Sequence, residues 1–164
     1  MNQLYYGDNL QVLREHLGPE SVDLIYLDPP FNSKRDYNLL FKSPKGKASE
    51  AQIEAFKDSW HWGLQAEREF DQILNQQNVN AAKLVKALVE FLGRNDMTAY
   101  LVMMANRLLE LHRVLKASGT LYLHCDPTAS HYLKIVLDAV FGVDHYRNEI
   151  IWKRSNPKSH GSVN

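Results

Sequence analysis

Several features that would define other protein classes are scarce in this sequence. It has one cysteine in 164 residues, Cys125, which excludes an intramolecular disulfide framework and is compatible with a reducing cytoplasm. No apolar run approaches the ~18 residues of a membrane span, and the N-terminus lacks the basic and apolar segments of a secretory signal. One cysteine with seven scattered histidines provides no zinc-type spacing. We therefore expect a cytoplasmic protein without a membrane span or a metal site.

An excess of positive charge is also missing, because the formal net charge is zero. This argues against binding nucleic acid through overall basicity, but not through a local patch. Most charge runs are only solvated surfaces. One run in residues 33–47 follows the motif described below, sets five basic residues against the single acid Asp36, and is a candidate DNA contact: Lys34, Arg35, Lys42, Lys45 and Lys47.

The length predicts one domain, and the hydrophobic pattern alternates between strands and helices. Leu101, Leu108 and Leu115 belong to a stripe repeating at spacings of 3 and 4, which indicates a helix. Such alternation predicts right-handed crossovers and an α/β fold with a mostly parallel sheet. Strands are expected at 3–6, 22–27, 120–124 and 148–153, and helices at 10–17, 97–116 and from Asp126, as N-cap, to Gly142.

An insertion of about 33–95 separates the second strand from the longest helix. Residues 32–48 are polar and broken by Pro44 and Gly46, which predicts a long loop. Helices are expected at 49–58, 64–77 and 80–92, around a segment that contains Trp60 and Trp62. We interpret the two tryptophans as packing residues rather than base contacts.

Acidic residues follow three of the predicted strands: Asp8, Asp28 and Asp126. Ligands of parallel sheets bind beyond the carboxyl ends of the strands. His124 and Asp126 could line such a site, although capping and packing explain them equally well. Cys125, between them, is interpreted as a small packed residue rather than a nucleophile.

The sharpest motif is Asp-Pro-Pro-Phe at residues 28–31, directly after an apolar strand. Taken alone, it could be a strand-ending turn. It also suits methylation of an exocyclic amine, whose lone pair is delocalised until acceptors are aimed at its protons. A carboxylate is one acceptor, and a carbonyl held by the fixed φ of proline is another. The aromatic side chain can stack on a base that has left the duplex.

The segments 4–10 and 21–32 strongly resemble the N-terminal part of bacterial DNA amino-methyltransferases of the adenine-N6 and cytosine-N4 type. The order is that of the permuted subgroup, in which the catalytic motif precedes the cofactor motif. Segments 111–119, 122–127 and 148–152 resemble the elements that follow in the same subgroup. The resemblance implies a partial Rossmann-like methyltransferase fold, S-adenosylmethionine as cofactor and DNA as substrate.

The resemblance also implies roles for individual residues. Asp28 and the Pro29 carbonyl would accept the amino protons, with Pro30 fixing the backbone and Phe31 stacking on the flipped base. Asp8, together with Asn9, would hold the adenine end of S-adenosylmethionine. Asp8 could also be a helix N-cap, and the two roles are compatible. Aspartate at the first motif position favours adenine N6 over cytosine N4.

The glycine-rich cofactor motif and the target-recognition region that the resemblance implies are absent from the 164 residues, which contain no Gly-x-Gly turn. We expect the chain to be part of a longer enzyme. A split subunit and a decayed remnant are the alternatives. In each case a second polypeptide or a downstream segment would complete the cofactor site, and an unpaired sheet edge would favour self-association. A catalytically inactive nucleic-acid- or partner-binding module, and methylation of RNA, protein or cytosine N4, remain open.

Overall fold

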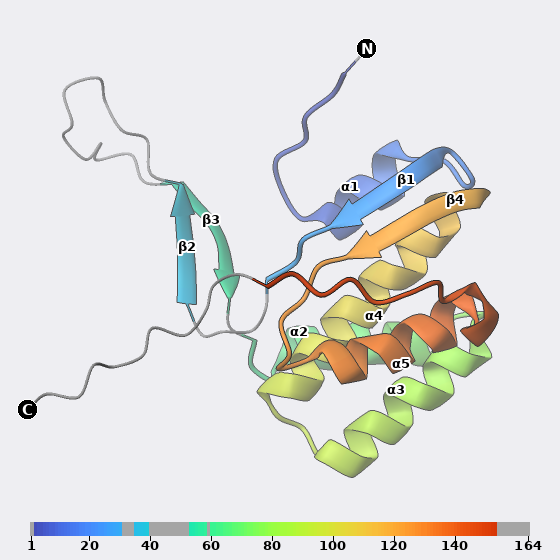
Figure 1. Cartoon of the computed structure of the whole chain (residues 1–164). Helices are drawn as coiled ribbons and strands as arrows, with labels where there is room; N and C mark the ends of the chain where they lie inside the picture. The colour runs from blue at the N-terminus through green and yellow to red at the C-terminus, as the bar shows by residue number, and fades with distance from the viewer. Residues whose placement is uncertain (1, 31–34, 40–52, 59, 154–164) are drawn as a thin grey trace, which may run out of the picture.

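The computed structural model describes residues 2–30, 35–39, 53–58 and 60–153, with side chains in 2–30 and 60–153 (Figure 1). Strands β1 (Val22–Leu27) and β4 (Leu115–Leu123) form a parallel sheet. Strands β2 (Arg35–Leu39) and β3 (Ile53–Asp58) form a separate antiparallel pair. Five helices and a short 3-10 helix complete the described part: α1 (Asn9–His16), α2 (Leu64–Leu74), α3 (Val79–Leu92), α4 (Asp96–Val114), α5 (Ser130–Phe141) and η1 (Val143–His145).

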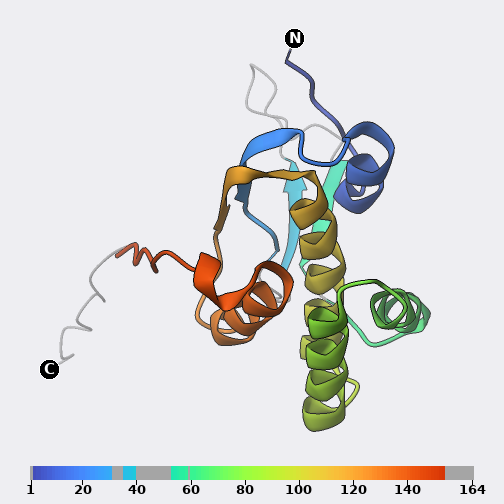
Figure 2. The same ribbon diagram turned by 90° about the vertical axis from the view of Figure 1, so that its right-hand side faces the viewer.

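The parallel pairing of β1 with β4 confirms the predicted α/β, partial Rossmann-like fold. The register runs from Leu24 opposite Thr120 to Leu27 opposite Leu123. Helices α1 and α4 lie on one side of this sheet, as Figure 2 shows, and α5 packs against α4 and α3. The crossover from β1 to β4 contains the antiparallel pair and three helices, so the insertion lies within a single crossover connection.

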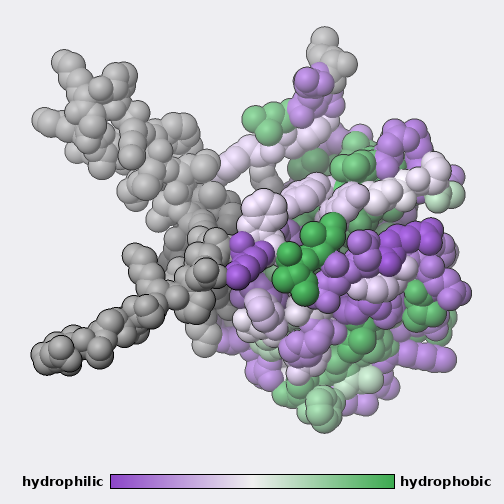
Figure 3. Space-filling view, viewed as in Figure 1, coloured by the Kyte–Doolittle hydropathy of each residue, from purple (hydrophilic) through white to green (hydrophobic). Residues whose placement is uncertain are grey.

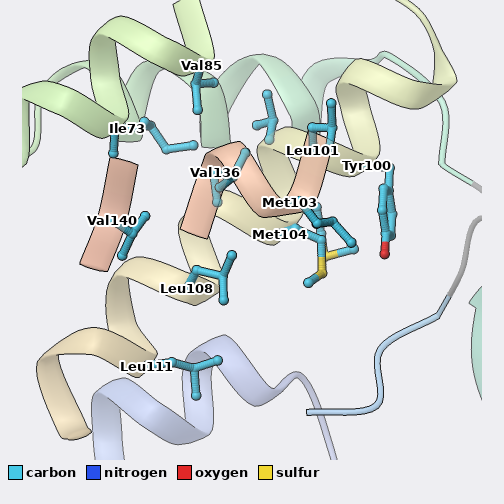
Figure 4. Close-up of a cluster of buried hydrophobic side chains, with 14 of the residues drawn as sticks. Ile73, Val85, Tyr100, Leu101, Met103, Met104, Leu108, Leu111, Val136 and Val140 are labelled. Atoms are coloured by element: carbon cyan, nitrogen blue, oxygen red, sulfur yellow. The ribbon is translucent and has the colours of Figure 1, made fainter. Parts of the chain in front are cut away.

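Helix α4 is the centre of the hydrophobic core. It begins with a capping box in which the Asn95 side chain accepts from the Thr98 amide and Thr98 accepts from the Asn95 amide. Residues 98–106 are all buried, because α1, α2, α3 and α5 pack around this helix. The predicted stripe faces the core, and Figure 4 shows Leu101, Leu108 and Leu111 among side chains of α2, α3 and α5.

The predictions are wrong at residues 35–39 and 53–58, while the rest of the expected loop (32–48) and of the first expected helix (49–58) lies outside the described residues. Strand β2 lies inside the expected loop, and residues 53–58, expected to be helical, form β3. Residues 53–58 contain Glu, Ala and Lys, which favour a helix when they are considered locally. Pairing with β2 supplies their backbone hydrogen bonds instead, and this non-local partner overrides the local preference.

Both expected terminal strands are also absent among the described residues. Residues 3–6 and 148–153 belong to no strand in the described part of the chain, and the Leu4 side chain is fully exposed. A strand forms only where another strand satisfies its backbone groups. No backbone hydrogen bond joins residues 148–153 to β4 in the described part, and Figure 2 shows the red segment running outward from the sheet.

The ends of two further elements differ from expectation. Helix α4 stops at Val114 instead of residue 116, and β4 begins at Leu115 instead of residue 120. Helix α5 begins at Ser130 and not after Asp126. The Asp126 carboxylate accepts from the amide and hydroxyl of Thr128, 3.0 and 3.1 Å away, so it closes a turn before the helix.

One face of the parallel sheet is open in the described part of the chain. Leu24 and Tyr26 on β1 are 58% and 64% exposed, and Tyr122 on β4 is exposed beside Tyr26. Figure 3 shows the side of the molecule seen in Figure 1, where green and pale side chains interrupt the purple polar surface. Strands of parallel sheets are normally covered on both faces. No helix among the described residues is long and apolar enough to cross a membrane.

Candidate active site

The carboxyl ends of β1 and β4 leave the sheet side by side. The pairing continues one step past the strands, where the His124 amide donates to the Leu27 carbonyl over 2.8 Å. This bond places the segment that starts at Asp28 next to the segment that starts at His124. The loop after β1 and the loop after β4 therefore form one edge, as expected for a parallel sheet.

Asp28 stands at this edge with its carboxylate exposed, and within the described residues it has no hydrogen-bond or ion-pair partner. Pro29 and Pro30, which follow, are half-buried. An exposed carboxylate is accessible to a ligand, while the prolines restrict the backbone around it. The assigned stacking residue, Phe31, lies outside the described residues.

Asp8 caps helix α1. Its backbone is extended, with φ −67° and ψ 118°, and its Oδ1 accepts from the Leu10 amide over 3.0 Å. Gly7 precedes it with φ +144°, a conformation that favours glycine. The N-cap interpretation is thus confirmed. Figure 1 shows the start of α1 and the C-terminal end of β1 at the same end of the parallel sheet.

An arginine that we did not predict as a site residue holds both candidate cofactor residues. Arg107 of α4 donates from Nη2 to Oδ1 of Asp8 and from Nε to Oδ1 of Asn9, each over 2.9 Å. The sequence distance is 98 residues or more, so no local pattern reveals the contact. The only signal is that Arg107 lies off the apolar stripe of α4.

Cys125 packs against the core as predicted, half-buried beside the loop that begins at Asp126. Burial raises the pKa of the Cys125 thiol, and the carboxylates of Asp126 and Glu149 raise it further. A raised pKa keeps the thiol protonated at neutral pH, which is the reverse of an activated nucleophile.

The two tryptophans of the insertion pack as predicted. The Trp60 ring meets Tyr100 edge-on at 5.5 Å between centroids, and Trp62 meets Phe70 at 6.0 Å. Arg94 lies over the Trp62 ring. Their partners are core residues of α2 and α4, so they anchor the insertion to the helical layer.

The side chains of the basic run after the motif lie outside the described part of the structure. Arg35 begins β2, but its side chain is not described. The other four basic residues, Lys34, Lys42, Lys45 and Lys47, lie outside the described residues. Their assignment to DNA contact stays a prediction.

With this geometry in view, the chain belongs to the N6/N4 DNA methylase family. The family model, described as DNA methylase, matches residues 22–163. The match includes the sheet, the Asp-Pro-Pro-Phe motif and the whole insertion.

Curated relatives include subunits of restriction-modification enzymes and a methyltransferase. The chain is 27% identical to the Mod subunit of the type III enzyme StyLTI of Salmonella typhimurium, over 99% of the chain and 22% of that protein. It is 25% identical to the EcoP15I Mod subunit of Escherichia coli, over 98% of the chain and 22% of that protein. Identity to the type II methyltransferase M.KpnI of Klebsiella pneumoniae is 23%, over 94% of the chain and 27% of that protein. The chain thus spans about a quarter of their lengths or less.

Proposed function

We propose that this protein acts as a site-specific DNA methyltransferase, transferring a methyl group from S-adenosylmethionine to N6 of a flipped adenine. One observation carries the proposal most directly. In a chain of this family, the Asp28 carboxylate is exposed and unpartnered within the described residues, at the carboxyl end of a parallel strand and ahead of two prolines.

The chemistry proposed for this edge is proton acceptance. The Asp28 carboxylate accepts a hydrogen bond from one amino proton, and the Pro29 carbonyl accepts one from the other. Both bonds shift electron density onto the amine as positive charge develops there, so their value is greatest in the transition state. When bound, the cofactor supplies an electrophilic methyl group, and no protein nucleophile is required.

The residues at the start of α1 fit one end of such a cofactor. Within the described residues, both hydrogen bonds to the Asp8 carboxylate go to Oδ1, and the side chain is 45% exposed. The carboxylate can therefore accept from amino or hydroxyl hydrogens of a bound nucleoside. We assign Asp8, supported by Asn9, to the adenine end of S-adenosylmethionine.

DNA is the proposed substrate because the family is described as DNA methylase and the relatives are named as restriction-modification proteins. Phe31 would stack on the flipped base, and the basic run would contact the phosphates of the DNA. With DNA as substrate, we expect the protein in the cytoplasm. The aspartate of the motif favours adenine N6 over cytosine N4.

We further propose that polypeptide carrying a glycine-rich cofactor motif covers the open sheet face. Leu24, Tyr26 and Tyr122 present an exposed apolar surface there, and the chain spans only 22% of the first relatives. Covering such a face is favourable, because burying apolar surface contributes about 25 cal/mol of free energy per Å². The covering segment would belong to the same polypeptide, to a second subunit or to another copy.

The substrate assignment is tested by incubating the full-length protein with duplex DNA and cofactor carrying a labelled methyl group. After the DNA is digested to nucleosides, the label is expected in N6-methyldeoxyadenosine and not in any cytosine nucleoside. Matched RNA and unmodified protein serve as controls. Label in N4-methylcytosine, or preferential label in RNA or protein, would contradict the adenine-N6 assignment.

The proposal for the open face is tested by isothermal titration of S-adenosylmethionine. We expect the 164-residue chain to bind it more weakly than the same chain together with the segment that carries the glycine-rich motif. Light scattering on the same samples reports whether copies of the chain associate. If the monomeric 164-residue chain and the longer protein bind S-adenosylmethionine with equal affinity, the proposal that a further segment completes the cofactor site is refuted.

A further inference from the structure

Arg107 joins the start of α1 to the insertion. We infer that Arg107, ion-paired with Glu69 of α2, is a positioning residue that fixes Asp8 and Asn9 in the orientation that binds the cofactor. The inference rests on the proposed function, because it assigns a purpose to a contact with the cofactor residues. It also gives the insertion a role in the site.

The contacts of Arg107 use the full fork of its guanidinium. Nη2 donates to Asp8 and Nε donates to Asn9, while Nη1 donates to the Met103 carbonyl over 3.1 Å. Three bonds to three different residues determine the position of the planar group. A lysine ammonium cannot reproduce this geometry, because it is a single point of charge on a flexible stem.

Burial makes these contacts costly to lose. The Arg107 side chain is 13% exposed, and Glu69 on the opposite side is 10% exposed. The Glu69 Oε2 atom is buried without a hydrogen bond among the described residues, and it lies 3.6 Å from Nη1 of Arg107. The Arg107 guanidinium and the Glu69 carboxylate therefore neutralise each other in a partly desolvated environment. Removing either one leaves the other charge poorly paired.

The consequence for Asp8 is orientation. Its side chain is 45% exposed and would otherwise sample several rotamers. Because Oδ1 accepts from both Leu10 and Arg107, the carboxylate is restrained, and Oδ2 takes part in neither bond. Fixing a binding group before the ligand arrives reduces the ordering cost of binding.

A second arginine provides a matched control. Arg113 lies on the same helix and ties it to the opposite end of α1, donating to the carbonyls of Leu13 and Leu17 over 2.9 and 3.1 Å. Arg107 and Arg113 thus both join α1 to α4. Only Arg107 reaches Asp8 and Asn9.

The test measures the dissociation constant of S-adenosylhomocysteine by calorimetry in the full-length protein, together with the melting temperature. We expect Arg107→Gln to weaken binding about tenfold or more. The substitution removes the charge-assisted hydrogen bond to Asp8 and the hydrogen bond to Asn9, which together orient the site. Arg107→Lys should recover the fold but only part of the affinity. Arg113→Gln should lower the melting temperature and leave the affinity unchanged.

A double-mutant cycle separates positioning from general stability. If Arg107 acts through Asp8 as well as Asn9, Arg107→Gln weakens binding by a smaller factor in the Asp8→Asn background than in the wild type. Glu69→Gln, which keeps the side-chain size, should weaken binding in the same direction but less. It also serves as the folded variant if Arg107→Gln does not fold.

The outcomes are distinguishable. Additive losses in the cycle, or Arg107→Gln binding as tightly as the wild type, would overturn the role of Arg107 alone. A folded wild-type protein that binds neither S-adenosylmethionine nor its product would instead overturn the proposed function. An equal loss of affinity in Arg113→Gln would also overturn it, because the effect of Arg107 would then come only from the packing of α1 on α4.

Discussion

Asp28→Ala is expected to reduce methyl transfer by at least about 10²–10³-fold in the full-length protein, the cost of removing one preorganised group from a charge-stabilising site. The variant keeps the strand, because Asp28 follows β1 and its side chain is exposed and unpartnered within the described residues. It removes the acceptor that is strongest while the amine develops charge. The loss should therefore appear in kcat, with the KM for DNA little changed.

Asp23 is the matched control for this substitution. It lies near the other end of the same strand, is also exposed, and pairs with Lys116 over 2.8 Å. An exposed ion pair contributes little to stability, so Asp23→Ala should leave both kcat and the melting temperature nearly unchanged. Single-turnover rates with labelled cofactor measure both variants. Turnover by Asp28→Ala within a few-fold of wild type would refute the role of Asp28.

The cofactor provides a second readout of Asp28→Ala. Because Asp8 caps α1 and Arg107 lies on α4, and neither belongs to the motif loop, affinity for S-adenosylhomocysteine should be largely kept. Asp8→Asn should show the opposite pattern, with weakened cofactor affinity. Together the two variants divide the site into a target side and a cofactor side. Loss of cofactor binding in Asp28→Ala would show that this division is wrong.

The sequence predicts the elements whose stability comes from their own pattern. Helix α4 is one, because its stripe and its N-terminal capping residues are both local signals. Strand β1 is another, since its apolar run stops at two prolines. Asp28 could be identified for the same reason: strand, acid and prolines are contiguous.

The errors fall where partners distant in sequence decide the structure. Segments 35–39 and 53–58 become strands only because they pair with each other. Segments 3–6 and 148–153 have strand-like composition, but no described neighbour pairs with them. Arg107 was missed for a related reason, because its partners Asp8 and Asn9 precede it by 98 residues or more. Local periodicity carries no information about such pairings.

The second large effect is expected in the core, where Leu108→Ala should lower the free energy of unfolding by about 2–5 kcal/mol. Leu108 is completely buried on α4, and Figure 4 shows it in the cluster that includes Leu111 and Val136. Alanine would leave a cavity that the helices packed around α4 can close only in part, because the interior is close-packed. Urea unfolding measures the change, with an unchanged m value as the sign that only stability is altered.

Leu64→Ala is the control for the core substitution, because Leu64 begins α2 and is 79% exposed. Its effect should stay within about 0.5 kcal/mol. The two variants also test how the core supports the site. Helix α4 carries both Leu108 and Arg107, so partial collapse around Leu108 should weaken cofactor affinity as well as stability. If Leu108→Ala costs no more than Leu64→Ala, the packing of α1 and α5 around α4 is not as described.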